Sequence, residues 1–443
     1  MALTPAQPHW PDSLRREDGT LAIDGVRLDS LADRFGTPLY VADVATVRHR
    51  ALAYQSALRR FYPGASAVHY AAKAYLSTPM ASLLASLGCG FDLSSFGEAT
   101  IVRAAGCSLA SSHLHGNAKS DDEIRLSLEA GVGSIAIDNR SEVGRVASIA
   151  ADLGLPASTL VRVAPDIEAE THAHIMTGQR DSKFGVPLDD LDDVGAAIAR
   201  SPSLELAGLH FHLGSQLGSP QAYARAIDVV SAAAASLRRH HGLETRVLSP
   251  GGGLGIAYTG GDELPSINEF IHAVATATVA SAGVHGLDLP KLIVEPGRSI
   301  VGPAVVALYR VMGSKTLSTN SRIIHVDGGM GDNLRPALYG AELDAAIVGN
   351  GATRDTETVD IAGRFCESGD IICRRVRLPT PSVGDLVAIP AAGAYTVSMA
   401  SNYNGALRPA VVAVDEGRAL VWQRRESYAD LIARDVTTIR AGR

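Results

Sequence analysis

Residues 66–93, with the sequence SAVHYAAKAYLSTPMASLLASLGCGFDL, contain the pattern that decides the fold. A short apolar run at Ser66–Ala71 is followed by a helical stretch at Thr78–Leu87 and then by a second apolar run at Gly90–Leu93. Short apolar runs bounded by Gly or polar residues predict buried strands, and the stretch between them predicts a crossover helix. These residues are therefore predicted to form one strand–helix–strand unit with parallel strands.

The same pattern continues as far as Val294, and its first five apolar runs recur about every 23 residues. Eight alternations of strand and helix are what a closed parallel barrel requires, because each crossover helix covers the next piece of sheet. A doubly wound open sheet is the alternative. The other predicted helices are Asp121–Ala130, Ser141–Leu153 and Pro220–His241. The eight predicted strands are Ser66–Ala71, Gly90–Leu93, Leu109–Leu114, Ser134–Ile137, Thr159–Ala164, Glu205–Leu213, Thr245–Leu248 and Lys291–Val294.

The sequence changes character after about Pro303, where short β-like segments alternate with Gly, Pro and Asp and helical periodicity is weak. Leu21–Val41 has a similar character, so we expect it to pair with the C-terminal part. The predicted fold class is α/β plus β: a (βα)8 barrel of the TIM type at residues 44–303, and a second, discontinuous β-rich domain made of residues 1–43 and 304–443. The C-terminal β-like segments are Val305–Val311, Arg322–Val326, Asp370–Leu378, Leu386–Ile389 and Ala410–Val414.

The composition excludes several classes of protein. A chain of 443 residues that is 46% hydrophobic and 20% charged can bury a large core. Its net charge of −7 is too small and too evenly spread to indicate a nucleic-acid binder. The chain contains no apolar run long enough to span a bilayer, and the charged, proline-containing start does not resemble a signal peptide, so we expect a cytoplasmic protein. Four cysteines without CxxC spacing fit a reducing compartment.

Chemically useful side chains fall at or just after the predicted strand ends. In a barrel, all of them would lie on the C-terminal rim, where barrel active sites form. The simpler explanation is that strand ends are polar because loops are polar. The set comprises Lys73, Asp92, His115, Asn117, Asp138, Arg162, His212, Gly251–Gly253, Glu295 and Arg298.

Three of these positions indicate specific chemistry. Lys73 lies among apolar and aromatic residues, where loss of hydration lowers a lysine pKa and frees the neutral amine for a Schiff base, although a lysine at a strand end can also simply reach solvent. The Gly251–Gly253 run can expose backbone N–H groups to a phosphate, but it matches neither a dinucleotide nor a P-loop motif. Glu295 could keep a heterocyclic nitrogen protonated while Arg298 binds a phosphate or carboxylate; a structural ion pair is the alternative.

Three His-x-His pairs raise the question of a metal site. Side chains two residues apart on a strand point to the same face, so such a pair can bind a metal. No HExxH or carboxylate-rich partner accompanies them, and we therefore predict no metal site. The pairs are His113/His115, His172/His174 and His210/His212. An isolated cysteine such as Cys366 is, taken by itself, expected to be buried and inert.

In combination, these segments resemble the fold-type III pyridoxal-phosphate decarboxylases, and among them the diaminopimelate decarboxylases. The resemblance extends from about Gly36 to Asp435, and the family consists of an alanine-racemase-like barrel plus a β domain. The motifs that carry it are Tyr70-Ala-Ala-Lys-Ala, His115-Gly-Asn-Ala-Lys-Ser, Ser182-Lys-Phe-Gly, His210-Phe-His-Leu-Gly-Ser-Gln, Gly251-Gly-Gly-Leu-Gly, Glu295-Pro-Gly-Arg, Asp327-Gly-Gly-Met, Asn333-Leu-Arg-Pro-Ala-Leu-Tyr, Cys366-Glu-Ser-Gly-Asp, Gly393-Ala-Tyr395 and Ser398-Met-Ala-Ser-Asn-Tyr-Asn.

The resemblance implies pyridoxal 5′-phosphate as cofactor, with Lys73 bound to it covalently and His212 stacked on its ring. It also implies decarboxylation of meso-2,6-diaminopimelate to L-lysine, the last step of lysine biosynthesis. Cys366 matches the proton donor, and together with Glu367 it would come from the second subunit of a homodimer with shared active sites. The implied substrate-binding residues are Arg298, Arg335, Tyr339, Glu367 and Tyr395. The implied cofactor-binding residues are Lys73, Asp92, Arg162, His212, Ser215, Gly251, Gly252, Gly253, Glu295, Gly297, Arg298 and Tyr395.

Departures from the family pattern leave other functions open. Phe96 stands where the family commonly has Gly, and Ser249-Pro250 replaces an Asp–hydrophobic pair before the three glycines. Thr396-Val397 and Gly405-Ala406-Leu407 are further differences. The main alternative is a paralogous decarboxylase of a related carboxylate-bearing amino acid or a D-amino acid in secondary metabolism. A racemase and a non-catalytic cofactor carrier are two others, although such carriers lack a C-terminal domain like that of this chain.

Overall fold

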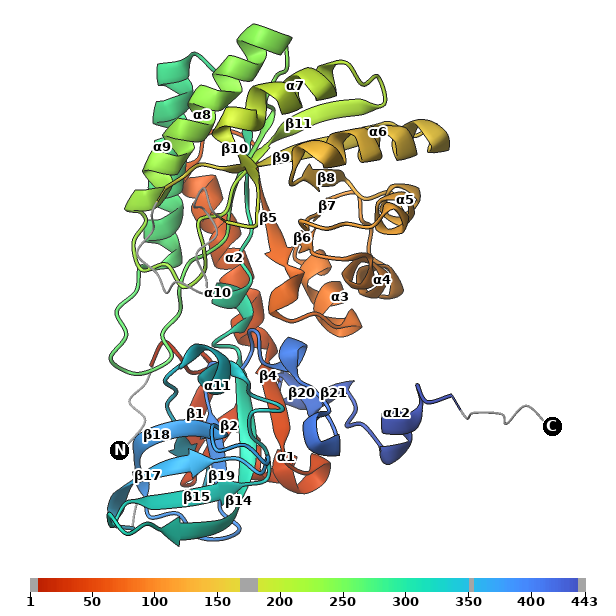
Figure 1. Ribbon diagram of the computed structural model, residues 1–443. Helices are drawn as coiled ribbons and strands as arrows, with labels where there is room; N and C mark the ends of the chain where they lie inside the picture. The colour runs from red at the N-terminus through yellow and green to blue at the C-terminus, as the bar shows by residue number, and fades with distance from the viewer. Residues whose placement is uncertain (1–6, 168–181, 350–353, 437–443) are drawn as a thin grey trace, which may run out of the picture. The chain divides into compact units, whose positions relative to one another are not determined.

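The protein has two compact units, seen here in a computed structural model that describes residues 7–167, 182–349 and 354–436 (Figure 1). The barrel unit consists of residues 47–257 and 261–301. The β unit consists of residues 1–46, 258–260 and 302–443. Among the described residues, no helix combines the length and apolar character needed to cross a membrane.

The barrel unit is a closed ring of eight parallel strands. The ring closes because β13 pairs with β5 and β8 pairs with β9. This confirms the predicted closed barrel and excludes the open sheet. In order around the ring, the strands are β5 (Ser66–Ala71), β6 (Gly90–Leu93), β7 (Ser112–Leu114), β8 (Ser134–Ile137), β9 (Ala157–Ala164), β11 (Leu204–His210), β12 (Val247–Gly251) and β13 (Lys291–Val294), while the short β10 (Val186–Pro187) pairs with β9.

A helix follows each strand of the ring, and the longer helices pack on its outside (Figure 1). Several of these helices begin at a Ser or Asn whose side chain accepts the backbone N–H three residues on, which fixes where the preceding loop ends. The loops between strand ends and helix starts therefore have defined lengths. The helices are α2 (Val44–Phe61), ahead of β5, and α3 (Thr78–Ser86), α4 (Phe96–Ala104), α5 (Asp121–Glu129), α6 (Arg140–Leu153), α7 (Leu191–Ala199), α8 (Gln221–His241), α9 (Ile267–His285) and α10 (Arg298–Val301), with the 3₁₀ turns η1 (Ala72–Ala74) and η3 (Leu188–Asp190).

The β unit contains a nine-stranded mixed sheet and a small antiparallel sheet, β1 to β3. The N-terminal strand β4 pairs with β14 and β20, so the expected pairing of the N-terminal segment with the C-terminal part is present. The path through the large sheet is β18-β17-β15-β14-β4-β20-β21, with β19 beside β14 and β16. The strands are β1 (Leu14–Glu17), β2 (Thr20–Ile23), β3 (Val26–Arg27), β4 (Leu39–Asp43), β14 (Val305–Thr316), β15 (Arg322–Val326), β16 (Ala346–Ile347), β17 (Thr356–Ala362), β18 (Ile371–Pro379), β19 (Leu386–Ile389), β20 (Ala410–Asp415) and β21 (Arg418–Gln423).

Short helical elements complete the β unit. The helix α1 (Leu28–Phe35) packs Leu28, Leu31 and Ala32 into the core that the small sheet shares with β4, β14 and β20. The other short elements are α11 (Arg335–Tyr339), α12 (Tyr428–Ile432), η4 (Val397–Met399) and η5 (Tyr403–Gly405). The last two lie in the loop between β19 and β20, which is therefore a structured segment.

The structure corrects three of the sequence-based elements. Leu21–Val41 is not β-like throughout, because α1 lies within it. The predicted strand at Leu109–Leu114 begins only at Ser112, since Leu109 is buried in a turn and its carbonyl accepts the Ser112 N–H. The predicted strand at Glu205–Leu213 ends at His210. Buried apolar turn residues resemble strand residues in sequence, which explains the last two errors.

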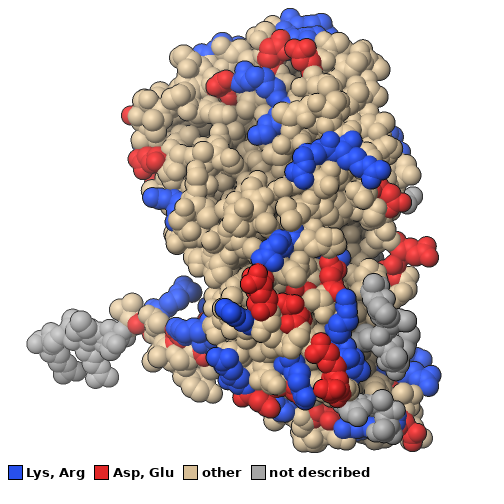
Figure 2. All heavy atoms as spheres, turned by 180° about the vertical axis from the view of Figure 1, so that it is seen from behind, with Lys and Arg blue, Asp and Glu red and all other residues tan. Residues whose placement is uncertain are grey.

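Charged side chains of both signs are mixed on one face of the molecule. Figure 2 shows Lys and Arg side chains interspersed with Asp and Glu on the face that it draws. A mixture of this kind on one face gives no extended field of one sign there.

Candidate active site

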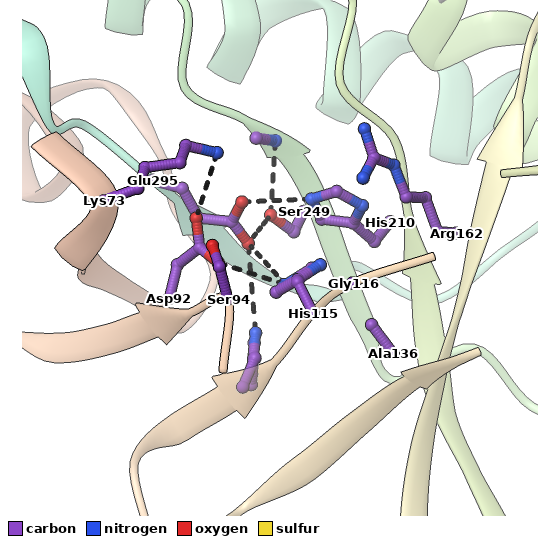
Figure 3. Close-up of polar contacts among 12 residues, drawn as sticks. Lys73, Asp92, Ser94, His115, Gly116, Ala136, Arg162, His210, Ser249 and Glu295 are labelled. Carbon is purple, nitrogen blue, oxygen red and sulfur yellow. Dashed lines mark hydrogen bonds and ion pairs between the residues drawn. The ribbon is translucent and has the colours of Figure 1, made fainter. Parts of the chain in front are cut away.

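Glu295 lies at the centre of a buried polar cluster at the C-terminal ends of the barrel strands (Figure 3). It directly follows β13. Ser249 of the neighbouring strand β12 donates through Oγ to Glu295 Oε1 at 2.8 Å. His210, at the end of β11, places Nε2 3.0 Å from Glu295 Oε2. Side chains from two adjacent strands thus hold both carboxylate oxygens in place.

Two further histidines lie near this carboxylate, and a third packs on one of them. His113 Nδ1 lies 3.9 Å and His115 Nε2 3.8 Å from Glu295 Oε1. The rings of His69 and His113 are 4.3 Å apart, and those of His115 and His210 are 4.4 Å apart. No hydrogen bond from another described residue reaches His113 Nδ1 or His115 Nε2, although both residues are buried. We call His69, His113, His115 and His210 the histidine cluster.

Three members of the histidine cluster favour the ionised form of Glu295. Burial alone would raise the pKa of Glu295, but His210, His113 and His115 hold that pKa well below its usual range. Burial in turn lowers the pKa of His115 well below its ordinary value, with His210 adding to the effect. The cluster therefore keeps an ionised carboxylate inside the barrel.

Lys73 and Asp92 lie beside this cluster. Lys73 is in η1, directly after β5, and its Nζ is 3.8 Å from Asp92 Oδ2 at the end of β6. The Asp92 side chain is 4% exposed and that of Lys73 is 44% exposed. The expected loss of hydration at Lys73 is thus not found in the single chain, because the side chain leaves the apolar strand at the 3₁₀ turn. An accessible amine next to a buried carboxylate results.

The other predicted cofactor residues of the barrel unit lie on the same rim. Burial and the charge of Lys73 lower the pKa of His212 well below its ordinary value. Arg298 donates to Ser215 Oγ at 2.7 Å. Arg162 stacks over the ring of Phe184 at 4.4 Å. These contacts bring together side chains from the ends of β9, β11 and β13.

The three glycines at the end of β12 make close backbone contact with the Glu295 turn. Gly251 and Gly253 have φ values of 73° and 109°, which favour glycine. A Cβ on Gly252 would collide with the carbonyl oxygen of Glu295, so only glycine fits there. Backbone N–H groups without side chains, together with Arg298 and Ser215, are the kind of donor set that binds a phosphate.

The comparisons with known proteins agree with this geometry. The sequence model of the family described as "Pyridoxal-dependent decarboxylase, pyridoxal binding domain" matches residues 44–302. The chain belongs to this family. Diaminopimelate decarboxylase from Synechocystis sp. is 39% identical to this pyridoxal-dependent decarboxylase, with 98% of this chain and 95% of the relative covered. The Bacillus subtilis enzyme of the same name is also 39% identical, with 96% and 97% covered. The crystal structure of diaminopimelate decarboxylase from M. jannaschii with L-lysine has a TM-score of 0.90 and 32% identity, and covers 96% of this chain and 98% of that one.

The family confirms the predicted cofactor, pyridoxal phosphate, and the donor set described above fits it. An exposed lysine amine suits covalent attachment of an aldehyde, and a buried ionised carboxylate suits a protonated ring nitrogen. Phosphate donors lie on the same rim. This pyridoxal-dependent decarboxylase therefore carries each kind of group that the cofactor needs on its barrel unit.

The remaining predicted residues lie in the β unit. The Arg335 guanidinium stacks over Tyr258 at 4.7 Å and lies 5.5 Å from the Tyr339 ring. Tyr395 has a φ of 56°, an uncommon backbone conformation for an aromatic residue. Cys366 is exposed, so the expectation that an isolated cysteine would be buried and inert is wrong here, because Cys366 lies in the loop after β17.

Sequence reasoning gave no role to the ion pair of Lys119 and Glu142, whose side chains are only 3% and 1% exposed. Lys119 Nζ donates to the carbonyls of Gly116 at 2.6 Å and Ala136 at 2.7 Å, and it lies 3.0 Å from Glu142 Oε1. Glu142 also accepts the Asp138 N–H at 2.9 Å. The pair ties the loop after β7, which carries His115, to the first turn of α6. In the sequence, the ion pair was indicated only by Lys119, the lysine of the motif at His115–Ser120.

Metal-type ligands meet at two places in the described part of the chain. The buried His113, His115 and Glu295 form one group, and the exposed Asp192 and His240 form the other together with the partly buried His241. Neither group contains His212, so His210 and His212 do not form a joint metal-binding pair in the described part of the chain. The third His-x-His pair, His172/His174, lies outside the described residues. In the first group the carboxylate is Glu295, which we assign to the cofactor below.

Proposed function

We propose that this protein releases CO₂ from meso-2,6-diaminopimelate to give L-lysine, the last step of lysine biosynthesis, with pyridoxal 5′-phosphate as cofactor. The observation that carries the proposal is the full-length similarity to enzymes named diaminopimelate decarboxylase at 38–39% identity. The barrel rim supports it, because Lys73, Asp92 and Glu295 offer the groups that such a reaction needs.

The cofactor-binding residues would be those of the barrel rim, together with Tyr395. Bound pyridoxal phosphate supplies an electron sink for the electron pair left when the carboxyl group departs. Lys73 Nζ would hold it covalently, and Glu295 would keep a proton on the ring nitrogen. The remaining proposed contacts, which include the ring of His212 and the phosphate donors, are Asp92, Arg162, His212, Ser215, Gly251, Gly252, Gly253, Gly297, Arg298 and Tyr395.

The substrate would be recognised by its second amino-acid end. A distal carboxylate needs cationic and hydroxyl partners, which Arg298, Arg335 and Tyr339 would supply, with Tyr395 nearby. Glu367 would bind the distal ammonium group. A site built for these groups rejects a substrate that lacks them, because its own polar groups would be left unpaired. This favours diaminopimelate over lysine or ornithine as the substrate.

Cys366 would return a proton to the α carbon after CO₂ has left. We propose that Cys366 and Glu367 serve the active site of a second copy of the chain in a homodimer. The functional division would be the barrel at residues 44–303 and the β domain at 1–43 and 304–443. All four cysteines are free thiols, which is consistent with a cytoplasmic protein.

A paralogous decarboxylase of a related carboxylate-bearing or D-amino acid remains a second candidate, favoured by one observation. Ser249, which replaces the usual acidic residue, donates directly to Glu295. The usual Asp would place a second negative charge there. The environment of Glu295 in this chain therefore differs from the family pattern.

One experiment separates these candidates. Purified protein loaded with pyridoxal phosphate is incubated with meso-, LL- and DD-diaminopimelate, with D-lysine and with L-lysine, and CO₂ release is measured. We expect release from the meso compound and loss of both activity and the visible absorption band of the bound cofactor in Lys73→Ala. CO₂ release only from another amino acid would show that the proposed substrate is wrong, and it would leave the assignment of the cofactor unchanged. Exchange of the α proton without CO₂ release would instead indicate a racemase.

A further inference from the structure

The loop between β17 and β18 carries Cys366 and Glu367, and one short turn holds both residues. The backbone N–H of Cys366 donates to Asn404 Oδ1 at 3.0 Å. The hydroxyl of Tyr403 donates to the Glu367 carboxylate. Tyr403 and Asn404 are neighbours in η5, so two adjacent residues of one segment contact two adjacent residues of another.

The base of this loop is also held by contacts outside that turn. Asp370 accepts the Phe365 N–H at 2.8 Å through Oδ2 and the Met330 N–H at 2.6 Å through Oδ1. The buried Phe365 ring stacks on Tyr403 and packs so closely on Gly331 that a Cβ there would collide with it. Cys366 and Glu367 are themselves exposed. The loop is thus anchored at its base. Its tip is closed by hydrogen bonds from the Glu367 N–H to the Phe365 carbonyl and from the Asp370 N–H to the Glu367 carbonyl, and η5 supplies the side-chain contacts to Cys366 and Glu367.

Asn404 suits its place in two separate ways. Its backbone has φ 51° and ψ 24°, the left-handed conformation that Asn, Asp and Gly adopt most readily. Its carboxamide oxygen accepts the Cys366 N–H. Glycine at this position would keep the backbone conformation and lose only the acceptor, so backbone and side-chain roles can be separated by mutation.

We propose that Asn404 is a positioning residue for Cys366, and that Tyr403 is a positioning residue for Glu367. This inference rests on the proposed function, in which Cys366 donates a proton and Glu367 holds the distal end of the substrate. Asn404 then acts on the proton-transfer step and therefore on kcat. Tyr403 acts on substrate binding and therefore on KM.

Four variants of the full-length holoenzyme test the proposal: Asn404→Gly, Asn404→Asp, Tyr403→Phe and a matched control. The control is Asn320→Gly, because Asn320 also has a positive φ, 60°, and lies in the turn between β14 and β15. We measure kcat and KM for meso-diaminopimelate. Without substrate, we follow hydrogen–deuterium exchange of the Cys366 amide by mass spectrometry.

The two positions should give opposite kinetic signatures. A general acid contributes about 10²–10⁴-fold, so partial misplacement in Asn404→Gly should lower kcat about tenfold and leave KM within about twofold. Losing the acceptor should speed exchange of the Cys366 amide about 2–10-fold. Asn404→Asp keeps an acceptor and should restore kcat to within about threefold of wild type. Tyr403→Phe should raise KM about 2–10-fold with little change in kcat, as expected for the net contribution of one exposed hydrogen bond.

Several results would overturn the proposal. Unchanged amide exchange in Asn404→Gly would show that the contact does not exist in solution. Faster exchange with unchanged kcat would establish the contact and remove its role in positioning. Parallel changes of kcat and KM in both variants would indicate a purely structural loop. A wild-type protein inactive on meso-diaminopimelate would overturn the proposed function and the kinetic half of this proposal, while the exchange measurement would still decide the contact.

Discussion

Replacing Lys119 by Met should destabilise the barrel unit strongly. The substitution leaves the Glu142 carboxylate buried without its cation, and removes the donor to the carbonyls of Gly116 and Ala136. Removing one partner of a buried ion pair costs about 3–5 kcal/mol. With a urea m-value of about 3 kcal/mol/M, the unfolding midpoint should fall by about 1–2 M. Glu142→Gln should cost less, because the amide oxygen can still accept.

The two units offer separate probes for this measurement. The two tryptophans, Trp10 and Trp422, both belong to the β unit. Most of the helices belong to the barrel unit, so far-UV circular dichroism follows the barrel. The lower midpoint should therefore be seen in the dichroism signal, with a smaller change in tryptophan fluorescence.

A double-mutant cycle decides whether the ion pair itself is responsible. Lys119→Met combined with Glu142→Leu should cost less than the two single substitutions together, by about 2–3 kcal/mol, because no uncompensated charge remains. A wild-type midpoint in Lys119→Met, or strict additivity in the double variant, would refute the reasoning.

Three further predictions concern single residues. Burial raises the pKa of Asp332 to about 7, so the folded state binds more protons than the unfolded one from about pH 4 to pH 7 and loses stability as the pH rises through this range. At 1.36 kcal/mol per pKa unit, the loss of stability reaches about 4 kcal/mol. Asp332→Asn keeps an acceptor for Tyr309 and should flatten the pH dependence of the thermal unfolding temperature. Parallel pH dependences of wild type and variant would contradict this prediction. Ser249→Ala removes a hydrogen bond to the charged Glu295, and such a bond is worth about 1.5–3 kcal/mol. The acidic limb of the pH–activity profile should therefore move up by about one to two pH units. Ser249→Thr is the control, because it keeps the hydroxyl group. Gly252→Ala forces the backbone away from Glu295 and should abolish retention of the cofactor on gel filtration, whereas normal retention would argue against the proposed loop.

The barrel could be predicted almost completely from the sequence. Buried parallel strands are short continuous apolar runs, and each of the eight that the sequence indicates is present. Errors arose at the ends, where buried apolar residues such as Leu109 lie in turns. The missed helix α1 left a detectable signal, since Leu28, Leu31 and Ala32 follow helical spacing and Gly36 ends the helix.

The site could be predicted only in part. Lys73, Asp92 and Glu295 stand at strand ends, which is a local property of the sequence. The convergence of His113, His115 and His210 on Glu295 could not be predicted, because it depends on the order of strands around the ring. The contact between Cys366 and Asn404 could not be predicted either, because it joins two residues that are 38 positions apart in the sequence.

The surroundings of Glu295 bear on how strongly a bound cofactor ring can withdraw electrons. An ionised carboxylate can only accept a hydrogen bond, so a ring nitrogen that faces Glu295 must carry the proton itself. A protonated ring withdraws electrons more strongly than a neutral one. That withdrawal helps to take up the electron pair left by a departing carboxyl group, and His210, His113 and His115 keep Glu295 ionised despite its burial. Replacing His210 by Phe would weaken this control, and it should therefore slow CO₂ release more at low pH than at high pH.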